Sequence, residues 1–195
     1  MERRGVTGRL EIRGKAAMSE TSPTAILKQD HVVAFTTVDA LAQDLAYPED
    51  VFWAKTAEGI HGRVAALRDA LLVHFRREEE ALFPEVVDLV SEDAPEADII
   101  AGFFHQESDD DLSAHTTLRL ALHGIANLLE RMTAPNARPQ HSITALRDRF
   151  ARARDLLSRH VEKEETVIFP MIERLLEEEQ LRAIAVRLAA ITSAI

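Results

Sequence analysis

Hydrophobic residues recur along this chain at alternating spacings of three and four, in four long stretches. Such spacing puts them on one face of an α-helix, and the alternation is typical of the buried seam of a helix bundle. No stretch sustains the alternation of two that a half-buried strand requires. The pattern therefore predicts an all-α protein, an up-down-up-down four-helix bundle. The four seams comprise Leu27, His31, Ala34, Val38, Leu41 and Leu45; Trp53, Ala57, Ile60, Val64, Leu67, Leu71, His74, Glu78 and Ala81; His115, Leu118, Leu122, Ile125, Leu129 and Met132; and Leu146, Phe150, Ala153, Leu157, His160, Glu164, Val167 and Met171.

The connectors between these stretches differ in length. Breaks at residues 47–50 and 134–139 have the length that joins antiparallel helices. Residues 91–111 form a longer interval, and a structureless loop of that length is uncommon. We therefore expect a short helix that covers one end of the bundle and is built on Ile99, Ile100, Phe103 and Phe104.

The two ends of the chain differ from its middle. Residues 1–17 are basic and irregular and lack the apolar segment of a secretory signal, and Ser22 followed by Pro23 is typical of a helix start. A short amphipathic helix near the other end should pack on the outside of the bundle through Leu181, Ile184, Leu188 and Ile191. We divide the chain into an N-terminal extension (1–22), a bundle (23–177) and a short extra C-terminal helix (178–195).

Composition excludes several classes of function. The chain has 195 residues and a formal net charge of -10, so it lacks the basic balance that nucleic acid binding requires. It contains no cysteine, which rules out disulfides, zinc–thiolate sites and iron–sulfur clusters. No apolar run reaches the ~20 residues of a membrane span. We expect a cytoplasmic protein that binds neither nucleic acid nor membrane.

Six polar residues interrupt the apolar seams at positions where the pattern requires a hydrophobe. A buried carboxylate without a partner is strongly unfavourable, and two within one core are more so. The seams supply no Lys or Arg at these levels, so a bound metal ion is the simplest compensating charge. Core histidines bonded to neighbouring glutamates are the alternative. The six residues, named the core polar set below, are His31, His74, Glu78, His115, His160 and Glu164.

Four members of the core polar set form two copies of one motif. His74 and Glu78 are four residues apart, as are His160 and Glu164, which places each pair on one helix face. Both copies end in a Phe-Pro pair, and every matched position is offset by 86. One His-x-x-x-Glu motif is common by chance, whereas two copies on core seams are a strong signal. In an up-down-up-down bundle all six residues can meet near one end of the core.

At these residues the sequence resembles the hemerythrin-like family of the bacterial type, also called the HHE cation-binding domain. The resemblance covers about residues 24–176, including Asp30-His31, both His-x-x-x-Glu motifs and both Phe-Pro tails. It implies a four-helix bundle with a non-heme centre of two irons per chain, bridged by oxo and carboxylate groups and ligated by the whole core polar set. Imidazole and carboxylate without sulfur suit iron, with manganese or zinc as less favoured metals.

One position departs from the family pattern. Oxygen-carrying hemerythrins have a second histidine one turn after the first on the third helix, where this chain has Arg119. With four histidines and two glutamates the irons are less completely ligated, so the resemblance points away from reversible oxygen carriage. We interpret Arg119 itself as a flank residue that pairs with a surface carboxylate, with a charge partner for a bound anion as the alternative.

The remaining histidines carry weaker signals. His61 and His123 lie one step off their seams, and we interpret both as flank residues, with a place beside the metal as the alternative. His105 lies in an acidic stretch that we interpret as a solvated loop, with a peripheral cation site as the alternative. His141 fits a helix start.

Three classes of function follow. The leading one is a diiron protein that binds, senses or detoxifies O2, peroxide or nitric oxide, or that handles iron. The second is a catalase-like diiron enzyme that consumes hydrogen peroxide. The third is a metal-free helical interaction module, and a homodimer formed through the terminal helix is an open alternative for the chain. Iron content separates the third class from the others, and turnover of hydrogen peroxide separates the second from the first.

Overall fold

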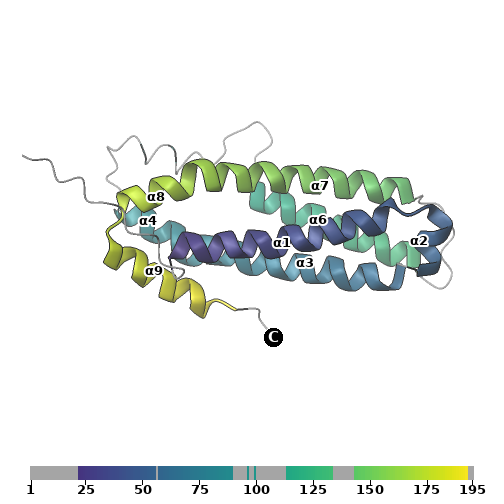
Figure 1. The fold of residues 1–195 in the computed structure, drawn as a ribbon, viewed down its shortest axis with the longest axis horizontal. Helices are drawn as coiled ribbons and strands as arrows, with labels where there is room; N and C mark the ends of the chain where they lie inside the picture. The colour runs from purple at the N-terminus through teal and green to yellow at the C-terminus, as the bar shows by residue number, and fades with distance from the viewer. Residues whose placement is uncertain are drawn as a thin grey trace, which may run out of the picture.

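The computed structural model describes residues 22–55, 57–89, 96, 99, 113–133 and 143–192, and these residues form helices without any strand (Figure 1). Two of the long helices continue through a π-helical turn into a short α-helix. In chain order the elements are α1 (Pro23–Ala46), α2 (Glu49–Lys55), α3 (Ala57–Arg77), η1 (Glu78–Leu82), α4 (Phe83–Leu89), α6 (Ala114–Thr133), α7 (Ile143–Lys163), η2 (Glu164–Ile168), α8 (Phe169–Leu175) and α9 (Glu178–Ala190).

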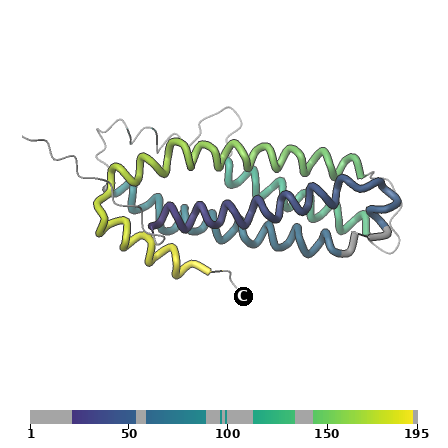
Figure 2. The backbone as a smooth tube through the Cα atoms, in the orientation of Figure 1, coloured from purple at the N-terminus to yellow at the C-terminus, as the bar shows by residue number. Residues whose placement is uncertain are grey.

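The long helices α1, α3, α6 and α7 form a four-helix bundle with up-down-up-down topology, which confirms the predicted fold class. Each helix packs against the next one along the chain, and α7 closes the ring against α1. Figure 2 shows the four backbones side by side, with α2 at one end and α4, α8 and α9 at the other. The starts of α1 and α6 therefore lie towards the end of the bundle at which α3 and α7 finish.

The sequence predicts the start of α1 correctly. Ser22 is the N-cap, and its hydroxyl accepts a hydrogen bond from the backbone N–H of Ala25 at 3.1 Å. Pro23 occupies the first helical position, where its missing N–H costs nothing because that group would have no intrahelical partner.

The predicted seams supply most of the apolar core, but three positions are wrong. One is Met132 in the third seam, which is only partly buried. Trp53 is only partly buried, whereas its neighbour Phe52 is fully buried. The reason is that α2 is a separate short helix with its own phase and not the beginning of α3. In the fourth seam Val167 is 43 % exposed and Ile168 is 0 % exposed, and the cause there is the local helix geometry.

Each copy of the duplicated motif contains a π-helical turn that begins at its glutamate. In η1 the N–H of Phe83 donates to the carbonyl of Glu78, five residues earlier, and Pro84 follows directly. A proline has no N–H and its ring crowds the carbonyl four residues before it, which favours a wider turn. The same arrangement recurs in η2 with the 86-residue offset. Because a wider turn holds one more residue, it brings Ile168 rather than Val167 to the core.

Helix α9 packs on the outside of the bundle at the end where both π turns lie. It lies against α1 and η1, with Ile184 and Leu188 buried and Leu181 and Ile191 partly buried, as the sequence predicts. This contact belongs to a second apolar cluster, separate from the main core. The buried members of that cluster are Leu27, Ala81, Leu82, Phe83, Val86, Ile168, Phe169, Met171, Ile172, Leu176, Ile184 and Leu188.

Some predictions concern residues that the structure does not describe. The N-terminal extension before Ser22, the connector at 134–139 and nearly all of the helix predicted around Ile99 to Phe104 lie outside the described residues. Between residues 90 and 112 only Glu96 and Ile99 are described, and Ile99 is exposed. Within the described part of the chain, the helices are too short or too polar to cross a membrane.

Candidate metal centre

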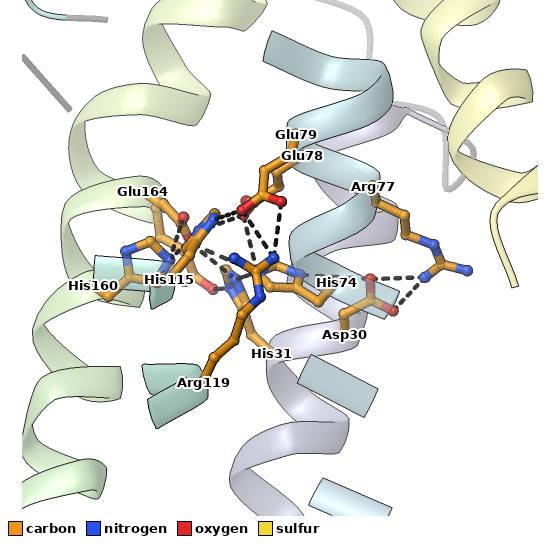
Figure 3. A network of polar contacts seen from close by, with 11 residues as sticks. Asp30, His31, His74, Arg77, Glu78, Glu79, His115, Arg119, His160 and Glu164 are labelled. Carbon is orange, nitrogen blue, oxygen red and sulfur yellow. Dashed lines mark hydrogen bonds and ion pairs between the residues drawn. The ribbon is translucent and has the colours of Figure 1, made fainter. Parts of the chain in front are cut away.

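The structure brings the whole core polar set together near one end of the bundle (Figure 3). Each long helix contributes one histidine, and each π turn contributes its first residue, a glutamate. All six side chains are buried, with no more than 5 % of any residue exposed. Periodicity thus placed each residue on the correct face, and helix packing brings the faces into contact.

The histidines meet as two pairs, one from each half of the duplication. Nε2 of His31 lies 3.2 Å from Nε2 of His74, and Nε2 of His115 lies 3.0 Å from Nε2 of His160. All four Nε2 atoms point inwards, so each half of the chain presents two imidazole nitrogens to the interior of the bundle (Figure 3).

The two glutamates lie between these histidine pairs. Oε1 of Glu164 is 2.8 Å from Nε2 of His160, and its Oε2 is 3.1 Å from Nε2 of His31. Oε2 of Glu78 is 3.1 Å from Nε2 of His115 and 3.5 Å from Nε2 of His74. Each carboxylate therefore faces one histidine of each pair.

Three further carboxylates face the outer nitrogens of the imidazoles. Glu165 lies 2.7 Å from Nδ1 of His31, and Glu79 lies 2.8 Å from Nδ1 of His115. A carboxylate on Nδ1 favours the tautomer with the proton there, which leaves the lone pair of Nε2 free to bind a metal. Asp30 stands on the same side of His74, with its Oδ2 3.6 Å from Nδ1.

Two arginines lie behind these carboxylates. Nη1 of Arg77 donates to both oxygens of Asp30 at 2.6 and 2.7 Å, and Nη2 of Arg119 donates to Glu79 at 3.0 and 2.8 Å. The guanidinium of Arg119 also lies over the ring of Phe75, 5.1 Å from its centre. The interpretation of Arg119 as a residue that pairs with a carboxylate is confirmed. The sequence did not show that this carboxylate itself holds His115.

The two buried glutamates of the set carry charges that burial disfavours. The oxygens of Glu78 and Glu164 are buried and accept no hydrogen bond of normal geometry among the described residues. Burial and the neighbouring Glu164 raise the pKa of Glu78 well above its usual value. Burial also opposes ionisation of Glu164, but the imidazoles of His160 and His31 lower its pKa. Two carboxylates buried side by side are unfavourable, and a cation between them would stabilise both.

The donor atoms are close enough to surround an ion. One ligand atom from each of His74, Glu78, His160 and Glu164 can be chosen so that all four lie within 4.8 Å of one another. Typical metal–ligand bonds of about 2.0–2.2 Å put opposite ligands about 4 Å apart, so a small contraction suffices. Imidazole nitrogen and carboxylate oxygen together suit iron or manganese. The residues present therefore fit a metal ion.

The other histidines lie away from this centre or outside the described residues. His61 forms a hydrogen bond of 2.9 Å with the hydroxyl of Thr133, near the start of α3 and the end of α6. His123 is exposed. Both are flank residues, as the sequence predicts. His105 and His141 fall outside the described residues.

Sequence reasoning missed the roles of Asp30, Glu79 and Glu165. A signal for the last two was present, because each directly follows a glutamate of the core polar set and the Glu-Glu doublet repeats with the 86-residue offset. The doublets have a shared geometry. In each, the first glutamate faces Nε2 and the second faces Nδ1 of one and the same histidine, His115 for η1 and His31 for η2.

Comparison with known proteins identifies the family. The model of the hemerythrin HHE cation-binding domain matches residues 22–172, and an overlapping match covers residues 106–192. The first match spans most of the chain, and the second spans the later half of the duplication. The comparisons with curated proteins and with solved structures found no match. With a matching bundle and a His/Glu cluster that could hold a metal, the chain belongs to the hemerythrin HHE cation-binding domain family.

Proposed function

We propose that this protein holds two irons with the core polar set and uses them to bind, sense or detoxify O2, peroxide or nitric oxide, or to handle iron. One observation carries the proposal: both glutamates lie between two histidine pairs, so that each carboxylate faces a histidine of either pair. A single ion would not need two such pairs. Iron is favoured because the donors are imidazole and carboxylate without sulfur.

When bound, the irons would supply redox-active Lewis acids able to take up a small exogenous ligand. The chain supplies four histidines and two glutamates for them, and six such residues shared by two ions leave coordination positions for that ligand. Arg119 occupies the place of a further histidine and is engaged with Glu79, so it adds no ligand. The centre is therefore more open than that of an oxygen-carrying hemerythrin.

The protein's own residues hold and shield the centre. Glu79 and Glu165 orient His115 and His31 from outside, as described above. The ring of Phe75 stacks on His115 at 4.2 Å and that of Phe169 stacks on His31 at 5.8 Å, measured between ring centres. Both phenylalanines are fully buried, so they keep water away from the imidazoles and hold the rings in place.

The deciding experiment is metal analysis with a visible spectrum of the freshly purified protein, followed by anaerobic reconstitution with Fe²⁺. We expect two irons per chain and an iron-dependent visible absorption. A colourless protein that takes up no iron under anaerobic conditions would contradict the proposal and favour a metal-free interaction module.

The openness of the centre favours one refinement, a catalase-like breakdown of hydrogen peroxide. The observation behind it is that Arg119 provides no further ligand, so that two exogenous atoms can approach the ions. Oxygen evolution from hydrogen peroxide by the iron-loaded protein would support this refinement. The Glu78→Gln, Glu164→Gln double variant is the matched control for adventitious iron. Peroxide turnover equal in both proteins would assign the activity to iron outside the centre.

A further inference from the structure

Arg77 connects the C-terminal helix to the metal centre. Its Nη1 donates to both carboxylate oxygens of Asp30, at 2.6 and 2.7 Å. Its Nε donates to the backbone carbonyls of Leu188 and Ile191, at 3.2 and 3.3 Å. One guanidinium on α3 therefore binds α1 through a side chain and the end of α9 through the backbone.

Asp30 lies between Arg77 and His74, a member of the core polar set. Its Oδ2 stands 3.6 Å from Nδ1 of His74, on the side of the ring that faces away from the two glutamates (Figure 3). Because the guanidinium contacts both oxygens of the carboxylate, it fixes the position of Asp30 beside the imidazole.

The end of α9 is well suited to hold an arginine. The last carbonyls of an α-helix carry partial negative charge, so they accept hydrogen bonds from a cation. The carbonyl of Leu188 accepts from Arg77 in addition to the N–H of Ile191. The helix itself is held in place because Leu188 and Ile184 are buried in the same apolar cluster as Leu27. Leu27 precedes Asp30 by about one turn of α1, so α9 is fixed close to the point where Arg77 and Asp30 meet.

The sequence does not repeat the Arg77–Asp30 pair, named the relay below, in the later half of the duplication. The 86-residue offset carries Arg77 to Lys163, and the residue before His115, equivalent to Asp30, is Ala114. An alanine side chain has no acceptor, so Ala114 cannot take the role of Asp30. The pair of Arg77 and Asp30 lies beside His74.

We propose that Arg77 is a positioning residue of the metal centre: it holds Asp30 against His74, and the carbonyl end of α9 holds Arg77. The inference rests on the proposed function, because it takes His74 as a metal ligand. It makes the C-terminal helix a support of the centre, although no side chain of α9 among the described residues belongs to the core polar set.

Arg76 offers a matched control. It precedes Arg77 and also touches the C-terminal segment, donating to the carbonyl of Thr192 at 3.3 Å. Its other partner is Glu80 at 2.8 Å, and neither contact leads to Asp30 or His74. Arg77→Ala and Arg76→Ala each remove an arginine of α3 that contacts the C-terminal segment. Only Arg77→Ala also removes the contact with Asp30.

The experiment compares full-length wild type, Arg77→Ala and Arg76→Ala by anaerobic Fe²⁺ titration against a competing chelator. Loss of an outer partner of a ligating histidine typically weakens metal binding by about ten- to a hundredfold. We expect a loss of that size for one of the two irons in Arg77→Ala and wild-type affinity for both in Arg76→Ala. Mössbauer spectra of ⁵⁷Fe-loaded protein should show a changed quadrupole splitting for one iron in Arg77→Ala only.

A second variant keeps the test decisive if Arg77→Ala does not fold. Asp30→Asn removes the carboxylate charge at nearly constant size, and it should weaken the same iron. Where both single variants fold, the double variant should lose no more iron affinity than the single variant that binds iron less tightly. The reason is that both substitutions act through His74. A role of Arg77 in stability alone would lower the melting temperature and leave iron affinity and spectrum unchanged.

The outcomes separate the two proposals. If wild type binds two irons, and Arg77→Ala and Asp30→Asn bind them as tightly as Arg76→Ala, the relay is overturned and the proposed function stands. If wild type binds no iron, the proposed function fails and the relay fails with it.

Discussion

Glu78 and Glu79 contact opposite nitrogens of a single imidazole on another helix, that of His115. Oε2 of Glu78 lies 3.1 Å from Nε2, and Oε1 of Glu79 lies 2.8 Å from Nδ1. Two consecutive residues of one helix normally point in different directions. Here the two carboxylates contact opposite nitrogens of one ring. The π turn that begins at Glu78 therefore positions the carboxylates at both Nε2 and Nδ1 of His115.

Glu79→Ala should weaken iron binding. Burial opposes ionisation of Glu79, but the hydrogen bonds from His115 and Arg119 lower its pKa to about 2, so it is ionised at neutral pH. Without it, Nδ1 of His115 loses its acceptor, and we expect a loss of about tenfold or more in iron affinity, measured by chelator competition. Glu80→Ala is the control, since Glu80 is exposed and bonds to Arg76. Equal affinities of the two variants would contradict the assigned role.

Replacing both Glu78 and Glu164 with Gln should abolish iron binding and preserve the bundle. Amides are weak ligands for iron, and the neutral pair removes the buried negative charge that requires a cation. Iron analysis should therefore give no bound metal, and far-ultraviolet circular dichroism should remain that of a helical protein. A double variant that still holds two irons would show that the metal lies elsewhere.

Removing the metal should lower the melting temperature. A ligand that binds only the folded state, present at a hundred times its Kd, stabilises that state by about 2.7 kcal/mol. For a chain of this size that corresponds to roughly 5–10 °C. Differential scanning calorimetry of the iron-loaded and metal-free protein checks this. Identical melting temperatures would show that the ion is not bound in the core.

Pro170→Ala should reduce iron affinity although Pro170 is exposed and is not a member of the core polar set. The alanine restores a backbone N–H and relieves the crowding of the carbonyl four residues earlier, so η2 can contract to a regular α-helical turn. Contraction would turn Glu164 relative to Ile168. Chelator competition measures the effect. Pro23→Ala at the start of α1 is the control, and it should leave iron affinity unchanged. Unchanged affinity in Pro170→Ala would show that the proline does not maintain the turn.

Ile168→Ala and Val167→Ala distinguish the observed helix phase from a regular one. Ile168 is 0 % exposed within the second apolar cluster, so its truncation should cost about 2–5 kcal/mol of unfolding free energy. Val167 is 43 % exposed, and Val167→Ala should change the unfolding free energy by about 0.5 kcal/mol or less. Urea unfolding measures both. The reverse order would mean that η2 is a regular α-helix in solution.

Much of the fold and the whole core polar set could be predicted from sequence. Burial of one helix face dictates an apolar spacing of three and four, so the polar residues that break this spacing stand out against it. The 86-residue repeat of the His-x-x-x-Glu motif adds a second, independent signal. Both signals are local to single helices, and neither depends on how the helices are placed around one another.

The phase of the seam after Glu164 could not be predicted in the same way. A regular period carries Val167 to the core, and only the wider turn in η2 brings Ile168 there instead. Pro170 is the sequence signal for that turn. However, a proline near the end of a helical pattern is equally consistent with a kink or a helix end.

The sequence by itself determined the helical class, the seams and the six buried polar residues, because helix periodicity and the cost of buried charge act within each segment. Only the tertiary structure decided the carboxylates behind the histidines, the π-turn phase and the connection from α9 through Arg77 and Asp30 to His74. The carboxylates and the connection through Arg77 are contacts between helices that involve partly exposed side chains. Periodicity assigns such side chains to the solvent face, and the packing of one helix against another selects their partners.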